Sequence, residues 1–160
     1  MISSACGTLR EAVTYIYELM LLRCPYVRAR EYLHDACLLP PTARACCEDA
    51  IETIFVVRYE RGEDPLRFHE PWNVFWEPED GGPYPGFAGQ LTLRAHESFC
   101  SSTLELRGTH TVPIACRGSM DMAHGAKLAS ATARALLARI GEQLEQRHTN
   151  EEARREQAAG

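Results

Sequence analysis

Residues 121–146 constrain the fold most, because they can form one long helix with a single apolar face. Apolar or small residues recur at every third or fourth position: Met122, Ala126, Ala129, Ala133, Leu137, Ile140 and Leu144. This spacing places them in one stripe on a helix surface. The stripe begins with alanines and ends with leucine and isoleucine. Such a helix can lie close to a sheet or leave room for a molecule beside it.

Two segments before this helix have the clearest strand pattern, residues 90–96 and 102–110. Each alternates apolar and polar residues, as expected for a sheet with one buried and one exposed face. The residues that share a face are Leu91, Leu93 and Ala95 in the first strand, and Leu104, Leu106, Gly108 and His110 in the second. We therefore expect an antiparallel sheet next to the long helix.

Residues 13–23, 51–60 and 71–77 favour three further strands. The first segment is rich in β-branched and aromatic residues, which suit a pleated surface. If it is extended, one face carries Val13, Tyr15, Tyr17, Leu19 and Leu21. Its Leu-Met-Leu-Leu run also suits a helix, so both interpretations stay open. In the segment 71–77, Trp72, Val74 and Trp76 share a face.

Two short helices are expected after the first strand. Pro25 suits the first turn of a helix over residues 26–38, and Thr42 is a plausible cap for a second helix running to about residue 50. Glycine and proline predict a turn at residues 61–65 and a loop at 78–87. Residues 148–160 are charged and have no apolar stripe, so we expect a frayed, disordered tail. The sequence thus predicts one α+β domain over residues 1–147.

Charge and cysteine content limit the partners. The 160 residues carry a net charge of −5 and no basic cluster, which disfavours nucleic-acid binding. No run of 18 apolar residues occurs, and no signal peptide is apparent, so we expect no membrane span. The seven cysteines are odd in number and lack CxxC spacing, which indicates reduced thiols in a cytoplasm.

The order of elements resembles the START-like (SRPBCC) helix-grip superfamily, which includes polyketide cyclase-type proteins. The resemblance rests on residues 76–144: Trp76-Glu77-Pro78, Pro85-Gly86-Phe87, Leu91-Thr92-Leu93, the run from Leu104 to Pro113, and the long helix. His110 stands where a tyrosine is more usual, and Pro113-Ile114-Ala115 replaces a common Pro-Leu-Gly.

That resemblance implies a curved antiparallel sheet wrapped around the long C-terminal helix. In many members the space between them holds a lipid, polyketide, steroid or other apolar molecule. The superfamily includes carriers, cyclases, oxygenase subunits and regulators, so it implies no single chemistry.

His110 is the strongest single candidate for chemistry. Strand parity places it with Leu104 and Leu106, toward the interior. There an imidazole could bind a ligand's polar group, or act as a general acid or base near neutral pH. A histidine bonded to a nearby backbone carbonyl is the simpler interpretation.

The expected function is a binding module for a small apolar molecule. The predicted ligand-binding residues are His110, Trp72, Trp76, Val74, Tyr17, Leu93, Leu106, Ala129, Ala133 and Leu137. The aromatic members, with Tyr15, are either a pocket wall or core. One alternative is a cyclase or aromatase that uses His110 as acid or base. Another is a filled cavity in a domain that acts through a protein partner.

We expect no metal and no cofactor. His34 and Cys37 lie one helical turn apart and Cys46-Cys47 follow, but their spacing matches no zinc pattern. Glu77, Glu79 and Asp80 are more typical of an exposed loop than of a catalytic pair. The sequence contains no nucleophile elbow, P-loop or dinucleotide fingerprint.

Overall fold

A computed structural model describes residues 12–35, 39–45, 53–61, 72–79, 86–98, 100–112 and 122–160. Six strands and two helices make up the described part. The strands are β1 (Ala12–Leu22), β2 (Thr42–Ala45), β3 (Thr53–Arg61), β4 (Trp72–Pro78), β5 (Gly86–Ala95) and β6 (Ser102–Val112), and the helices are α1 (Tyr26–Leu33) and α2 (Met122–Ala159). The fold is therefore α+β, as predicted.

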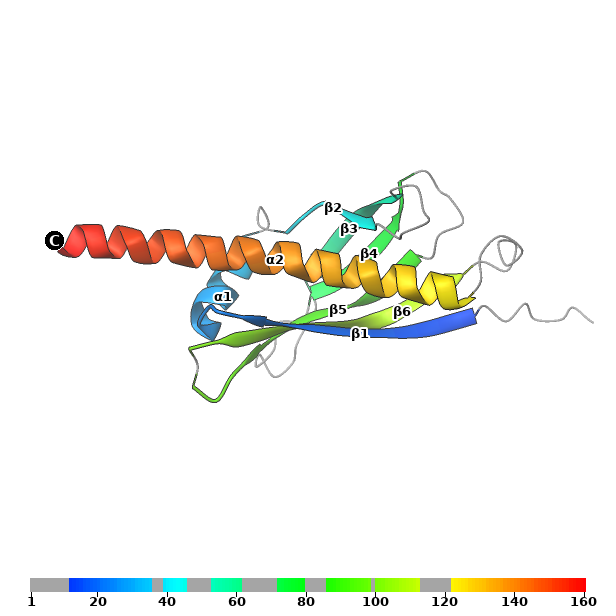
Figure 1. Ribbon diagram of the computed structural model, residues 1–160, viewed down its shortest axis with the longest axis horizontal. Helices are drawn as coiled ribbons and strands as arrows, with labels where there is room; N and C mark the ends of the chain where they lie inside the picture. The colour runs from blue at the N-terminus through cyan, green and yellow to red at the C-terminus, as the bar shows by residue number, and fades with distance from the viewer. Residues whose placement is uncertain are drawn as a thin grey trace, which may run out of the picture.

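The six strands form one sheet in the order β1-β6-β5-β4-β3-β2, and every neighbouring pair is antiparallel. The sheet curls, and α2 lies along its inner face with β1 on one side and β2 on the other (Figure 1). β1 and β2 are the two edge strands, so α2 spans the opening between the edges of the half-barrel.

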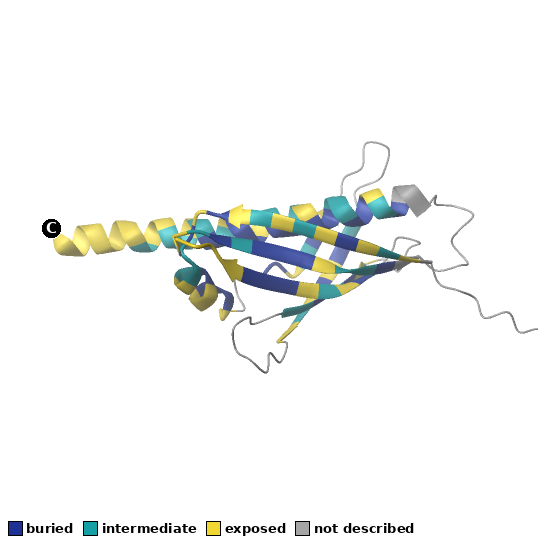
Figure 2. Cartoon of the chain, turned by 90° about the horizontal axis from the view of Figure 1, so that it is seen from below, coloured by how far each residue is buried: buried dark blue, intermediate teal, exposed yellow. Residues whose placement is uncertain are grey.

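The core lies between the inner face of the sheet and the apolar stripe of α2. Strand alternation determines which side chains enter it, because successive residues point to opposite faces. Figure 2 shows this alternation of buried and exposed residues along the strands. The fully buried large side chains on α2 are Leu128, Leu136, Leu137, Ile140 and Leu144. Burying each contributes about 1.5–3 kcal/mol relative to an exposed position.

Close packing between α2 and β1 depends on a glycine. A Cβ atom added at Gly141 would lie 2.6 Å from Met20 Cε and 3.1 Å from Leu22 Cδ2. The bare backbone at Gly141 thus makes space for both side chains of the edge strand.

Several predicted boundaries are confirmed and four are wrong. Residues 42–45 form a strand, where a helix was expected, because Thr42 and Ala43 pair with Val56 and Phe55 of β3. Arg139 of α2 also donates a hydrogen bond to the Thr42 carbonyl at 2.8 Å. These tertiary contacts outweigh the weak helix signal of a short segment. α1 ends at Leu33, and residues 36–38 and 46–50 lie outside the described residues.

The third correction concerns the C-terminus. α2 continues to Ala159, whereas residues 148–160 were expected to be a disordered tail. β5 also begins at Gly86, four residues earlier than predicted, because its pairing with β4 and β6 extends into the glycine-rich segment. None of the helices that the structure describes is long and apolar enough to cross a membrane.

Candidate functional site on the inner wall of the sheet

One row of paired residues crosses the inner wall of the sheet. The register aligns Thr14 of β1 with His110 of β6, His110 with Phe87 of β5, Phe87 with Trp76 of β4, and Trp76 with Val57 of β3. Directly paired residues on neighbouring strands point to the same face. The row therefore places a histidine, a phenylalanine and a tryptophan side by side.

Two glycines in the next row make this arrangement possible. Gly89 and Gly108 are paired, and the Phe87 ring lies over them. A Cβ added at Gly108 would lie 2.3 Å from the Ala88 carbonyl oxygen and 2.6 Å from Phe87 Cζ. One added at Gly89 would lie 2.5 Å from the same ring carbon. The ring thus occupies the space that side chains at these positions would need.

The Phe87 ring in turn stacks on the Trp76 indole. Their centroids are 3.9 Å apart and their planes differ by 11°. Both residues are buried, at 4% and 1% exposure. The middle of the wall is consequently a rigid aromatic surface.

His110 is buried at 1% exposure, and neither ring nitrogen makes a well-aligned hydrogen bond to a described residue. Trp76 Nε1 is also buried and unpaired among the described residues. Burial lowers the pKa of His110 below its ordinary value of 6.5, and a weak hydrogen bond with the Thr14 backbone opposes this shift only in part. The imidazole is therefore neutral at pH 7, with one N–H donor and one acceptor nitrogen.

Most of the predicted wall residues face the interior. The buried ones are Trp76, Val74, Leu93, Leu106, Ala129, Ala133 and Leu137, together with His110. Trp72 is half-buried at one end of the wall, where the Arg61 guanidinium lies 5.5 Å from its ring centroid. These residues come from β4, β5, β6 and α2, and the fold brings them to the interface between sheet and helix.

The placement predicted for Tyr17 is wrong. Tyr17 and Tyr15 lie on the outer face of β1, at 48% and 62% exposure. The alternation of β1 sends Ile16 and Leu22 inward, where both are buried. The apolar residues of one strand face were thus identified correctly but assigned to the wrong side of the sheet.

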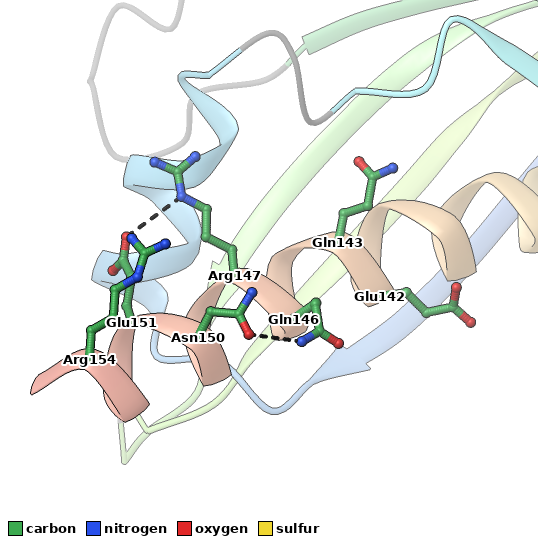
Figure 3. A pocket seen from close by; sticks show the side chains of 7 residues that line it. All are labelled: Glu142, Gln143, Gln146, Arg147, Asn150, Glu151 and Arg154. Carbon is green, nitrogen blue, oxygen red and sulfur yellow. Dashed lines mark hydrogen bonds and ion pairs between the residues drawn. The ribbon is translucent and has the colours of Figure 1, made fainter. Parts of the chain in front are cut away.

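The hollows lined by described residues lie at the surface and not at His110. One of about 640 Å³ runs beside the C-terminal half of α2, where Arg147, Asn150 and Glu151 line it (Figure 3). Another of about 250 Å³ is lined by Arg58 and Thr109 of the outer face, and also by Trp76 and Phe87. Both ring nitrogens of His110 are covered by surrounding atoms.

Metal chemistry finds no support in the described part of the chain. No three histidine, cysteine, aspartate or glutamate side chains gather there closely enough to hold a metal ion. Cys37, Cys46 and Cys47 lie outside the described residues. Cys24 is buried, and this burial raises the pKa of its thiol to about 11, so the thiol stays protonated.

The sequence pattern did not predict the stack of Phe87 on Trp76 or the glycine pair beneath it. The sequence does contain a sign of this arrangement, because Gly89 and Gly108 each interrupt the alternating pattern of a strand. A glycine inside a strand often marks a place where another group approaches the backbone closely. Recognising it required the pairing of β5 with β6, which the sequence alone did not give.

No protein-family model and no curated protein matches the sequence. Several solved structures, however, are similar to this chain in fold. A protein of Thermus thermophilus superposes with a TM-score of 0.55 at 13% identity, covering 82% of this chain and 97% of its own. The fold is helix-grip. The Zhui aromatase/cyclase of Streptomyces sp. R1128 gives a TM-score of 0.52 at 15% identity, covering 93% of this chain and 99% of its own.

A Bacillus thuringiensis protein gives a TM-score of 0.53 at 10% identity, covering 82% of this chain and 98% of its own. At these identities the likeness is one of fold alone. It confirms the helix-grip architecture that the sequence resemblance implied.

Proposed function

We propose that this helix-grip chain binds a small, mainly apolar molecule between its sheet and α2. The observation that carries the proposal is a pair of buried polar groups on one row of an apolar wall, the imidazole of His110 and Nε1 of Trp76, that make no well-aligned hydrogen bond to a described residue. Leaving a buried donor or acceptor unpaired costs about 1–3 kcal/mol. A ligand with a polar group at this row would recover that free energy.

The surroundings favour a ligand that is apolar elsewhere. Leu91 and Leu106 are paired in the adjoining part of the wall and both are fully buried. Contact with such side chains stabilises a complex by about 25 cal/mol per Å² of apolar surface removed from water. A donor on the indole and a neutral imidazole would then orient an oxygen atom of the ligand.

Because both ring nitrogens of His110 are covered, a ligand that reaches them has to move side chains or separate α2 from the sheet. The Phe87 ring is the neighbour of His110 on the sheet, and α2, whose Ala129 and Ala133 are buried, covers the inner face. A binding step that includes such a rearrangement is slower than diffusion allows. The ligand would stabilise the folded chain in proportion to the logarithm of its concentration.

Native mass spectrometry of the protein purified from its own host tests the proposal. We expect a mass increase that disappears on denaturation, and the extracted compound should raise the melting temperature of ligand-free protein. His110→Gln should weaken this thermal shift, whereas His96→Gln should not, because His96 is exposed on the segment after β5. A ligand-free mass and no thermal shift across a panel of lipids and polyketides would disprove binding.

A cyclase or aromatase activity is the second candidate. The observation in its favour is that His110 is neutral, since burial lowers its pKa, and that its nitrogens make no well-aligned hydrogen bond to other described residues. A neutral imidazole in an apolar wall can accept a proton from a substrate. Under this proposal His110→Gln lowers turnover by about a hundredfold or more, the usual contribution of a general acid or base. In a carrier the same variant changes affinity only.

A further inference from the structure

The outer face of β1 carries an exposed apolar stripe that neither the fold nor the proposed function uses. Its members are Val13, Tyr15, Tyr17, Leu19 and Leu21, each between 48% and 62% exposed. They occupy every second position of an edge strand. The alternate residues of β1 face α2, so burying the stripe requires something outside the described chain.

Two charged residues of β6 border the stripe. Glu105 is paired with Leu19 in the sheet register, yet it is only 6% exposed. Its carboxylate accepts a hydrogen bond of 2.8 Å from the Tyr17 hydroxyl and lies 3.0 Å from Arg94 Nε, so this charge is neutralised, as in the core of a protein interface, where unpaired charges are depleted. The exposed Arg107 is paired with Tyr17 and would lie at the edge of a contact made by the stripe.

We propose that a second copy of this chain covers the stripe, so that the protein forms a twofold dimer through β1. At the observed exposures the five residues present roughly 500 Å² per copy, near the upper end of the patches found on monomers. Two copies together would bury about 1,000 Å², the minimum expected of a specific interface. The net charge of −5 disfavours an anionic membrane surface as the occupant.

The pattern of the stripe suits a partner identical to itself. Tyr17 is the central residue of β1 (Ala12–Leu22). A twofold axis across the strand at Tyr17 brings Val13 of one copy to Leu21 of the other, and Tyr15 to Leu19. Twofold contacts are isologous in this way, with each residue pair occurring twice. All five side chains are then covered by one symmetric contact.

Sedimentation velocity of the full chain from about 1 to 100 μM, a range in which weak dimers dissociate, tests this proposal. We expect the mass to approach twice 17.9 kDa as concentration rises. Leu19→Arg should raise the dimer dissociation constant by about a hundredfold or more, because two guanidinium groups would be buried without partners. Val27→Arg should leave it unchanged, since Val27 is equally exposed but lies on α1. Circular dichroism checks that both variants are folded.

Cross-linking gives a readout that does not depend on a destabilising variant. Tyr17→Cys should form a disulfide-linked dimer under mild oxidation, beyond the level of the wild type. Val56→Cys should not, although Val56 is also an exposed outer-face residue, on β3. A wild-type chain that stays at 17.9 kDa at all concentrations would overturn the proposal. So would a dimer that Leu19→Arg leaves intact, or a stripe that binds lipid vesicles without self-association. None of these outcomes depends on the small-molecule ligand.

Discussion

The two halves of α2 are held in place by different forces. From Leu128 to Leu144 the helix presents a continuous buried stripe to the sheet. Among residues 145–160, all of which the structure describes, none is buried. Yet the helix continues to Ala159, and its last turns project beyond the sheet (Figure 1).

Contacts with α1 hold the second half where it leaves the sheet. The hydroxyl of Tyr32, a buried residue, donates a hydrogen bond of 2.6 Å to Glu151 Oε2. The Arg147 guanidinium lies 4.7 Å from the centroid of the Tyr32 ring. Arg147 also forms ion pairs with Asp35 at 3.0 Å and with Glu151 at 3.6 Å. One aromatic residue of α1 thus organises the charged turn of α2.

The difference between the two halves shows which interactions determine how long a helix is. Apolar burial fixes the first half, and once that half has formed each further residue adds a hydrogen bond without a new nucleation cost. The second half therefore needs only a few polar contacts to persist. A prediction from the apolar stripe alone ends the helix near residue 146. The polar contacts beyond that point involve no periodic apolar residues that the sequence could reveal.

The largest expected effect is in the first half. Leu137→Ala should lower the free energy of unfolding by about 2–5 kcal/mol, since Leu137 is fully buried and the sheet cannot close over the cavity. Urea denaturation followed by circular dichroism measures this loss. Arg134→Ala, an exposed change one turn earlier, is the matched control. A loss below about 1 kcal/mol for Leu137→Ala would show that the stripe is not the main support.

The next effect is a pH dependence that comes from the inner wall. Burial lowers the folded-state pKa of His110, so the unfolded chain binds more protons below pH 6.5. The stability that this group contributes is complete above pH 6.5 and is lost as the pH falls toward the folded pKa. Through this group, the free energy of unfolding changes by at most about 1.4 kcal/mol per pH unit.

Unfolding free energies of the wild type and His110→Leu, measured between pH 7 and pH 5, test this dependence. In His110→Leu, the free energy of unfolding should lose this part of its dependence on pH. His96→Gln should retain it. If the free energy of unfolding depended on pH equally in the wild type and in His110→Leu, His110 would have to be solvated, contrary to its burial.

A smaller effect is expected in the second half. Tyr32→Phe should lower the stability at pH 7 by less than Leu137→Ala does, because it removes one hydrogen bond to a charged group at the surface. The Tyr32 hydroxyl is the main cause of the lowered pKa of Glu151, whose ordinary value is 4.5. This contribution is present above pH 4.5 and is lost as the pH falls through the folded pKa. The difference between wild type and variant should therefore shrink at pH 3, and a constant difference would point to lost packing instead.

The smallest effect should come from the end of the helix. Removing residues 154–160 should change the free energy of unfolding by less than about 0.5 kcal/mol, because these residues are all exposed. The helical signal in circular dichroism should fall only in proportion to the residues removed. A loss above about 1 kcal/mol would reveal a stabilising contact in the last turns.

The sequence predicted the sheet, the long helix and the direction of His110, because alternation and helical spacing are local patterns. It did not predict the direction of Tyr17, since both faces of β1 carry apolar residues and only the position of α2 tells them apart. The strand at Thr42–Ala45 escaped prediction because four residues carry little pattern of their own. Its pairing with β3 supplies the information instead.

The interlocking of Phe87 with Gly89 and Gly108 should couple the residues that these three positions can hold. A side chain at either glycine position is compatible only with a smaller residue at position 87, so a single substitution is harmful where a paired one is tolerated. Related chains should therefore vary at these positions together, and a large aromatic residue at 87 should accompany glycine at both others. A chain that departs from this trio would have a differently shaped inner wall.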